Sequence, residues 1–213
     1  MFRTTYVLMM MFSLVSAAFA TDEKYLQAMQ KHINAIYQAR DVQALQEVVN
    51  GFARIASVEK DKWEPLYYIA YGNIMMANFE QNGDSKDAYL DKANEVIKKA
   101  KTISPKEPEI ATLEGFSHMI RIGIDPQSRG MVYAPQAMEA YQRALSVEPN
   151  NPRALTLLAQ MQLGTARFFG SDSTEACQTN TKALQSFASY KSENVLAPVW
   201  GLKLAESLKS ECK

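Results

Sequence analysis

The residue types that most often carry catalysis or metal binding are sparse in this chain and poorly placed for either. The 213 residues include two histidines, His32 and His118, which lie far apart in the sequence. A zinc site needs three or four His, Cys or carboxylate ligands at matched spacing, and the sequence has no such set. It also lacks a glycine-rich phosphate loop, a G-x-S-x-G elbow and an H-E-x-x-H pair. We therefore expect no enzymatic activity, no cofactor and no metal, with His118 as a partly buried helical residue.

The N-terminus predicts export. Arg3 precedes an apolar stretch over residues 6–15, and Ala18 and Ala20 then form a small-x-small cleavage site. This pattern is typical of a secretory signal peptide over residues 1–20, with a mature chain that begins at Thr21. The alternative is an uncleaved N-terminal anchor. We expect a periplasmic location, with secretion as the other option, and no stable membrane insertion after cleavage.

Both cysteines, Cys177 and Cys212, lie in the mature part of the chain. Two cysteines in an exported protein are candidates for a disulfide. Cys177 falls near the start of one predicted helix and Cys212 just past the end of the next, and an antiparallel hairpin brings those two ends together. We predict a Cys177–Cys212 disulfide that holds the terminal helix, with two free thiols as the alternative.

The charge of the chain excludes two classes of partner. Lysine and arginine number 23, as do aspartate and glutamate, so the formal net charge is zero. Such a chain has no net field that would attract nucleic acid or an anionic membrane. It also has no basic stripe for a phosphate-rich partner. We expect no nucleic-acid partner.

A proline register organises the chain from Trp63 onward. Each of four prolines begins a helical pattern, a small residue follows seven places later, and the prolines recur about every 44 residues. Proline is tolerated in the first helical turn because its missing N–H would have no partner there. A small residue lets the neighbouring helix approach closely. The prolines are Pro65, Pro108, Pro152 and Pro198, and the small residues are Gly72, Gly115, Ala159 and Ala205.

The partner helices carry a second recurring set. It reads Ala93, Ile97, Ala100 and Pro105 in one copy, and Ala137, Tyr141, Ala144 and Pro149 in the next. This set resembles the second helix of a tetratricopeptide (TPR) repeat, which has a small residue, a large apolar one, a small one and a closing proline. Over residues 63–202 the order of motifs is also similar to exported bacterial TPR-like proteins. That resemblance implies an interaction module with no activity attached.

We therefore expect an all-α fold, a TPR-like solenoid of antiparallel helix pairs. Residues 21–62 would form a degenerate N-terminal pair that caps the stack, and residues 63–213 the repeats with a C-terminal capping helix. Loops are expected at 80–85, 121–133 and 167–173, because each is rich in Gly, Asp, Ser or Pro. The nine expected helices span 22–40, 42–57, 64–79, 85–103, 108–122, 134–147, 152–167, 173–190 and 197–210.

A binding surface is expected on the first helices of the repeats, which line the concave face in TPR proteins. The loop over residues 167–172 is a second candidate, and one of its two phenylalanines is expected to fill the core while the other is exposed. The resemblance places on the concave face Asn73, Met76, Thr112, Phe116, Met119, Thr156, Gln160 and Leu163, and the loop adds Arg167 and Phe169.

These features favour an exported, non-enzymatic binding or adaptor protein that holds a peptide or protein partner in a helical groove. The alternative is a periplasmic small-ligand or lipid carrier with an apolar pocket among the helices rich in tyrosine and methionine. An enzyme with a site at the loops over 121–133 or 167–173 is the least favoured class. It would need clustered polar groups with strongly perturbed pKa values at those loops.

Overall fold

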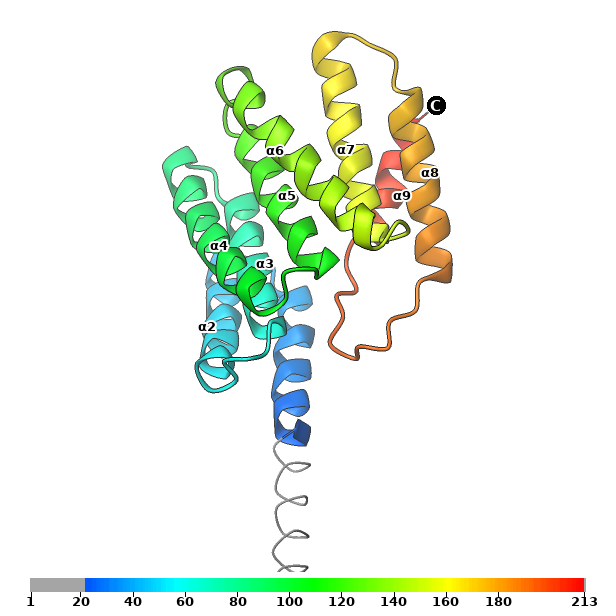
Figure 1. Cartoon of the computed structure of the whole chain (residues 1–213). Coiled ribbons are helices and arrows are strands. Elements are labelled where there is room, and N and C mark those ends of the chain that lie inside the picture. Colours follow the sequence, from blue (N-terminus) through cyan, green and yellow to red (C-terminus); the bar gives the residue numbers. More distant parts are fainter. Residues whose placement is uncertain (1–21, 213) are drawn as a thin grey trace, which may run out of the picture.

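A computed structural model describes residues 22–212, and helices make up most of them (Figure 1). The predicted signal peptide lies outside these residues. The helices form antiparallel pairs that stack side by side, and the described residues include no strand, so the predicted all-α solenoid is confirmed. The helices are 22–38, α2 (Val42–Val58), α3 (Glu64–Phe79), α4 (Gly83–Ile103), α5 (Pro108–Ile122), α6 (Pro126–Val147), α7 (Pro152–Phe169), α8 (Thr174–Ser189) and α9 (Leu202–Glu211).

The small residues of the register allow the helices to pack closely. The pairs α3–α4, α5–α6 and α7–α8 form hairpins, and α5 packs against both α3 and α7. A Cβ atom on Gly115 of α5 would overlap the ring of Tyr141 in α6, and one on Gly72 of α3 would overlap Val49 in α2. The role predicted for the small residue is therefore confirmed at these two places.

One apolar core runs through the stack, from Tyr25 in the first described helix to Leu196 after α8. Helix α3 is apolar on nearly all sides and is buried along most of its length. Its Tyr68 stacks on Phe52 of α2, with ring centroids 5.1 Å apart. Met76 is fully buried. The aromatic and methionine side chains of α3 thus mainly fill the core, and the carrier hypothesis needs its pocket elsewhere.

The loop predicted over residues 121–133 is wrong for most of its length. Helix α6 begins at Pro126, where the Asp125 carboxylate caps it by accepting a hydrogen bond from the backbone N–H of Ser128 at 3.3 Å. The helix then continues through Pro135, whose missing N–H would normally end or kink it. The carbonyl that loses its donor belongs to Met131, on an exposed turn where solvent can hydrogen-bond it. Asp125 and Pro126 form a cap and first-turn signal, whereas the loop was predicted from the Gly, Asp, Ser and Pro content of the segment.

Pro198, the fourth proline of the register, does not begin a helix, so the start predicted for the last helix is wrong. Residues 190–201, which we call the strap, run from α8 back to α9 without helix (Figure 1). The Tyr68 hydroxyl donates a hydrogen bond to the carbonyl of Leu196 at 2.7 Å, and the Trp200 indole donates to the Tyr67 hydroxyl at 2.9 Å. Side chains of α3, rather than a helical hydrogen-bond ladder, therefore hold the strap in place.

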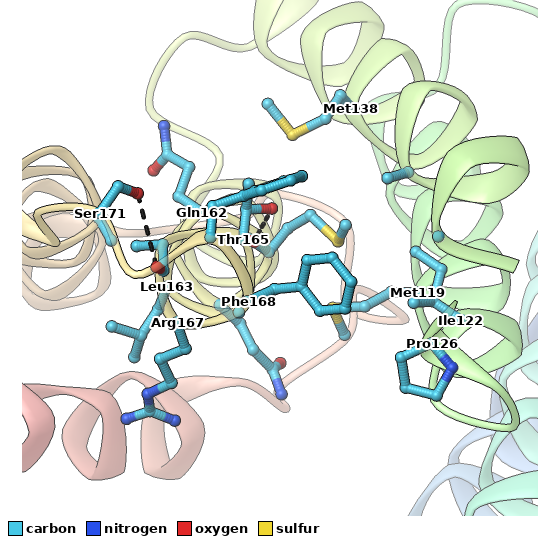
Figure 2. Close-up of a pocket in the computed structure, with 18 of the residues that line it drawn as sticks. Met119, Ile122, Pro126, Met138, Gln162, Leu163, Thr165, Arg167, Phe168 and Ser171 are labelled. Atoms are coloured by element: carbon cyan, nitrogen blue, oxygen red, sulfur yellow. Dashed lines mark hydrogen bonds between the residues drawn. The ribbon is translucent and has the colours of Figure 1, made fainter. Parts of the chain in front are cut away.

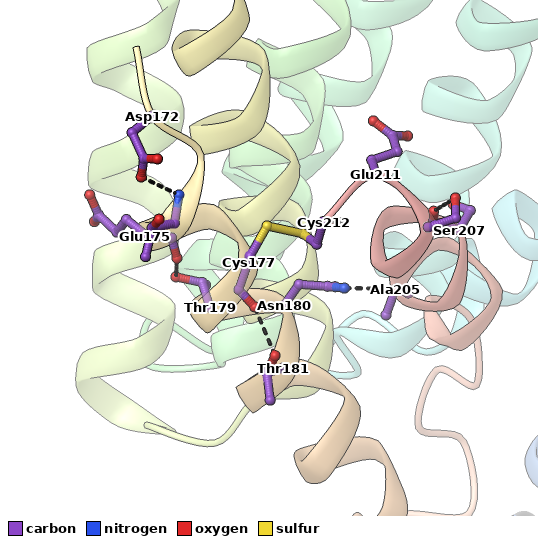
Figure 3. Close-up of a disulfide and its surroundings, with 12 residues drawn as sticks. Asp172, Glu175, Cys177, Thr179, Asn180, Thr181, Ala205, Ser207, Glu211 and Cys212 are labelled. Atoms are coloured by element: carbon purple, nitrogen blue, oxygen red, sulfur yellow. Dashed lines mark hydrogen bonds between the residues drawn. A yellow bond between two sulfur atoms is a disulfide. The ribbon is translucent and has the colours of Figure 1, made fainter.

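The predicted disulfide is confirmed. Cys177, near the start of α8, and Cys212, just past α9, are bonded, with their Cα atoms 5.5 Å apart (Figure 3). Nearby, the Asn180 side-chain amide donates a hydrogen bond to the carbonyl of Ala205 at 2.9 Å. The bond links residues separated by 35 positions. Closing a loop of that length stabilises a protein by about 3–4 kcal/mol in the chain-entropy model.

A carboxylate between three helices predicts a pH-dependent contribution to stability. Glu114 of α5 accepts hydrogen bonds from Lys101 of α4 at 3.0 Å and from Arg143 of α6 at 2.6 Å. Burial raises the pKa of Glu114, but hydrogen bonds and charges from Lys101 and Arg143 outweigh burial and hold the pKa below its usual value. This stabilisation is therefore complete above the unfolded-state pKa, about 4.3, and is lost as the pH falls through the lower folded-state pKa.

We expect Glu114→Gln to lower the melting temperature at about pH 7, and we expect the difference from the wild-type protein to shrink between about pH 7 and pH 3 as the wild-type side chain becomes protonated. Thermal unfolding of both proteins followed by circular dichroism across this range tests the expectation. A difference in melting temperature that stays constant with pH would show that the ion pairs contribute nothing.

Candidate ligand-binding groove

An open groove of about 1060 Å³ lies between two helical walls in the described part of the chain (Figure 2). One wall is made by the end of α5 and the first half of α6. The other is made by the second half of α7, with α8 and α9 beside it. In Figure 2 the Phe168 ring points from α7 toward Met119, Ile122 and Pro126 on the opposite wall. The side chains that give the groove its apolar character are Met119, Ile122, Met131, Met138, Met161, Leu163, Phe168, Phe169 and Leu208.

The two main walls meet the groove in different ways, and helical spacing explains the face that α6 presents. On α6 the lining residues Met131, Ala134 and Met138 are three and four positions apart, which places them on one side of the helix. On α7 every residue from Gln160 to Phe169 lines the cavity, so this half of the helix meets it on more than one side. A Cβ atom on Gly164 would meet no other atom within 4 Å. The glycine thus leaves space in the groove where a larger residue would fill it.

The mouth of the groove carries an exposed apolar patch. Met131 is 83% exposed, Phe168 59% and Phe169 69%. The expectation that one of the two phenylalanines fills the core is therefore wrong. The reason is that α7 extends through both of them and ends only at Gly170, which adopts the left-handed conformation with φ 65°. Contiguous exposed apolar surface of this kind marks binding sites in soluble proteins.

Polar groups line the end of the groove near α8 and α9. Arg167 is the one cationic side chain among the described lining residues, and it forms an ion pair with Glu211. Gln162 donates a hydrogen bond to Glu175 at 2.7 Å. The buried side-chain oxygens of Gln160 and Gln162 accept no hydrogen bond from the protein. Because these two oxygens are buried, the polar groups that this end of the groove offers to a bound molecule are the Arg167–Glu211 ion pair and Glu175.

The structure divides the predicted binding residues into two groups. Met119, Gln160, Leu163, Arg167 and Phe169 come together in the groove. The other five lie in the core, away from the groove, and they are Asn73, Met76, Thr112, Phe116 and Thr156.

The buried group has internal partners. The hydroxyls of Thr112 and Thr156 donate to the carbonyls of Pro108 and Pro152 within their own helices, at 2.8 and 2.7 Å. Phe116 stacks on Trp200 of the strap, with ring centroids 5.7 Å apart. The face expected to be concave and open is therefore covered by the protein's own chain at this point.

Residues that the sequence reasoning missed include Met131, Met138 and Gly164. Met131 belongs to the opening turns of α6, which the sequence reading assigned to a loop, whereas Met138 lies within the helix expected over 134–147. The Asp125–Pro126 signal would have placed Met131 on a helix as well, but no sequence signal shows that this helix faces α7 across a cavity. That arrangement depends on how three helix ends pack.

No candidate metal site is present among residues 22–212. No group of three or more His, Cys, Asp or Glu side chains there could hold a metal ion. The groove is lined by no histidine, cysteine or tyrosine within the described residues. His118 stacks on Tyr133, with ring centroids 5.8 Å apart, and burial lowers its pKa. A search of the same part of the chain found no helix both long and apolar enough to cross a membrane.

The architecture is that of a TPR-like helical-repeat protein. The structure of TTC0263, a thermophilic TPR protein in Thermus thermophilus, superposes with a TM-score of 0.57 over 91% of this chain and 95% of that one. The two sequences are 15% identical, so the likeness is one of fold. No protein-family model matches the chain, and no curated protein is significantly similar in sequence.

A second solved structure is more similar. The HusA haemophore from Porphyromonas gingivalis superposes with a TM-score of 0.80, at 29% sequence identity. The match covers 89% of this chain and 92% of HusA.

Proposed function

We propose that this protein binds a flat, mainly apolar ligand of the porphyrin class, haem or its metal-free relatives, in the groove between the α5–α6 wall and α7. The observation that carries the proposal is the groove itself, an open cavity of about 1060 Å³ whose walls bring together four methionines and two phenylalanines. Likeness to a haemophore over almost the whole chain supports it. The ligand is a cargo, and the protein acts on it by binding rather than by chemistry.

The chemistry of the walls fits a planar ring system. Methionine side chains are flexible and polarizable, so they adapt to the face of a ring, and aromatic rings stack on it. Burial of apolar surface contributes about 25 cal/mol per Å² to binding before the costs of association. The cavity lies near the upper end of the size range of small-molecule sites, about 300–1,000 Å³. The Met119, Gln160, Arg167 and Phe169 side chains are proposed ligand contacts, as are Met131 and Phe168.

The side chains that line the groove determine whether the protein could ligate haem iron. Histidine, cysteine and tyrosine are common axial ligands of haem iron, and none of them lines the groove in the described residues. Of the usual axial ligands, that leaves the methionine thioethers. We therefore propose that the ring, rather than the metal, is the main feature recognised.

An absorbance titration of the mature protein with haem and with metal-free protoporphyrin tests the proposal. Both ligands are expected to saturate one site with affinities within about tenfold of each other, which is 1.4 kcal/mol. A preference for haem far above this would assign the affinity to iron ligation by a methionine. Absence of binding by either compound would reject the proposed function.

A groove-filling substitution tests the location. Gly164→Leu adds a side chain into open space, so it should block the ligand without a steric clash inside the protein. We expect affinity to fall by at least about tenfold, while the melting temperature stays the same or rises, because replacing a helical glycine stabilises a helix by about 0.5–1 kcal/mol. Gly164→Ala is the matched control and should retain most of the affinity. Unchanged affinity in Gly164→Leu would place the ligand elsewhere.

A peptide or protein partner is the second candidate, favoured by the exposed patch of Met131, Phe168 and Phe169 at the mouth. An amphipathic helix of a partner would use the same apolar surface. A competition experiment tests whether the two ligands share one site. A peptide ligand from envelope extract should be displaced by protoporphyrin if both occupy the groove.

We further propose that the protein works outside the cytoplasm, in the periplasm, on the basis of its predicted signal peptide and its disulfide.

A further inference from the structure

Helix α9 forms the third side of the groove, and its own packing is slight. It contributes Leu208 and Glu211 to the lining. It is ten residues long, and no side chain caps its N-terminus, which follows Gly201 at φ 110°. Helices of this length are marginal in isolation. Its position therefore depends on what holds it against α7 and α8.

Side chains that pack α9 against α7 and α8 also form one side of the groove, which we call its floor. Leu208 packs with Ala159 and Leu163 of α7 and Ala176 of α8 in a small cluster that is separate from the main core. Three of these four side chains, Leu163, Ala176 and Leu208, also line the groove. Any displacement of α9 therefore opens the floor of the proposed binding site.

The disulfide sits directly behind this floor. Cys177 is next in sequence to Ala176, and Cys212 is next to Glu211, and both of those neighbours line the groove (Figure 3). The other tethers at this end are non-covalent: the Arg167–Glu211 ion pair, which is largely exposed, and the hydrogen bond from Asn180 to Ala205 at 2.9 Å. Exposed ion pairs contribute little to stability. The covalent bond is thus the strongest restraint on α9.

We infer that the Cys177–Cys212 disulfide is a positioning element of the groove, and that its reduction releases α9 and lowers ligand affinity. This inference rests on the proposed function. Both cysteines are partly exposed, so a dithiol reductant can reach them. One thiolate of the reductant attacks a protein sulfur and forms a mixed disulfide. Its second thiol then completes the exchange, leaving two protein thiols and the oxidised, disulfide form of the reductant.

The test compares the affinity of three forms of the mature protein for metal-free protoporphyrin: oxidised, reduced with dithiothreitol, and Cys177→Ser/Cys212→Ser. The metal-free ring is used because a reductant would change the oxidation state of haem iron. We expect the reduced form and the double variant to bind at least about tenfold more weakly than the oxidised form. Hydrogen exchange should show faster exchange in α9 and unchanged protection in α3, α5 and α7.

A second pair of variants separates loss of the wall from loss of the fold. Leu208→Ala keeps the disulfide but removes the α9 side chain that packs in the floor, and it should also weaken binding. Leu204→Ala is the matched control, because Leu204 lies on the same helix and packs against the main core instead. It should leave affinity unchanged. Equal losses in both variants would mean that general destabilisation, rather than the wall, lowers affinity, and would overturn the inference.

The outcomes distinguish the two proposals. Binding by the oxidised protein that is unaffected by reduction rejects the role of the disulfide and leaves the proposed function in place. No protoporphyrin binding by the oxidised protein rejects the proposed function and, with it, this inference.

Discussion

Glu109→Leu is expected to destabilise the protein by about 3–5 kcal/mol, because it leaves the Arg153 charge buried without a partner. The Arg153 and Glu109 side chains are 1% and 5% exposed. The guanidinium of Arg153 donates through Nε to both carboxylate oxygens of Glu109, at 2.9 Å each. Burial lowers the pKa of Arg153, but the charge of Glu109 outweighs burial and raises it, so the arginine stays charged.

Urea unfolding followed by circular dichroism measures the change. The informative comparison is the double variant Glu109→Leu/Arg153→Met, which removes both charges and should recover most of the lost stability, since apolar pairs of similar volume replace buried ion pairs well. Glu95→Ala is a surface control, because the Glu95–Lys99 pair is exposed and should leave the unfolding midpoint unchanged. A midpoint for Glu109→Leu that matches the wild type would contradict the role assigned to the pair.

The two residues of this ion pair follow the same period as the register prolines. Glu109 and Arg153 each follow a register proline, so they hold the same place in successive units. Asn151 adds a hydrogen bond to Glu109 at 2.6 Å, and the Tyr67 hydroxyl donates to it at 3.5 Å. The network therefore joins α3, α5 and α7, the first helices of three units. Glu109 is thus a buried carboxylate, and the residue as a whole is 4% exposed.

The stack could be predicted because its determinants are local. Pro65, Pro108 and Pro152 lie in the first turns of their helices, and Gly72 and Gly115 allow close contact, as expected. Each of these signals acts within one or two turns of its own helix. The disulfide was predictable for a similar reason, since antiparallel neighbours bring the two ends together.

The groove and the strap could not be predicted in the same way. The groove is set by where α6 and α7 begin and end, and composition assigned 121–133 and 167–173 to loops although helix occupies part of both. The strap matches the proline register at Pro198 yet is held by tyrosine hydroxyls of α3, which are more than 120 positions away in the sequence. Such long-range contacts leave no periodic pattern. Among the residues expected on the concave face, Phe116 was misplaced because Trp200 of the strap covers it.

Trp200→Ala is the second variant with a large expected effect, and it should destabilise the protein by about 3 kcal/mol. This value is at the low end for loss of a tryptophan because the side chain is partly exposed. The indole stacks on Tyr71 and Phe116, at centroid distances of 5.5 and 5.7 Å, and its N–H donates to Tyr67. Removal leaves a gap between strap and stack, and leaves the Tyr67 hydroxyl without this donor.

Trp200→Phe keeps the ring but loses the N–H, so it should cost only about 1 kcal/mol, the net value of one hydrogen bond. Val199→Ala is the matched neighbour, 73% exposed, and should not change stability measurably. Urea unfolding by circular dichroism gives the three values, and hydrogen exchange should show faster exchange confined to residues 190–201 in Trp200→Ala. Because Trp200 does not line the groove, protoporphyrin affinity of the folded variant should match the wild type. A variant that keeps its stability but loses the ligand would instead connect the strap to the binding site, and would require the groove to extend toward α3.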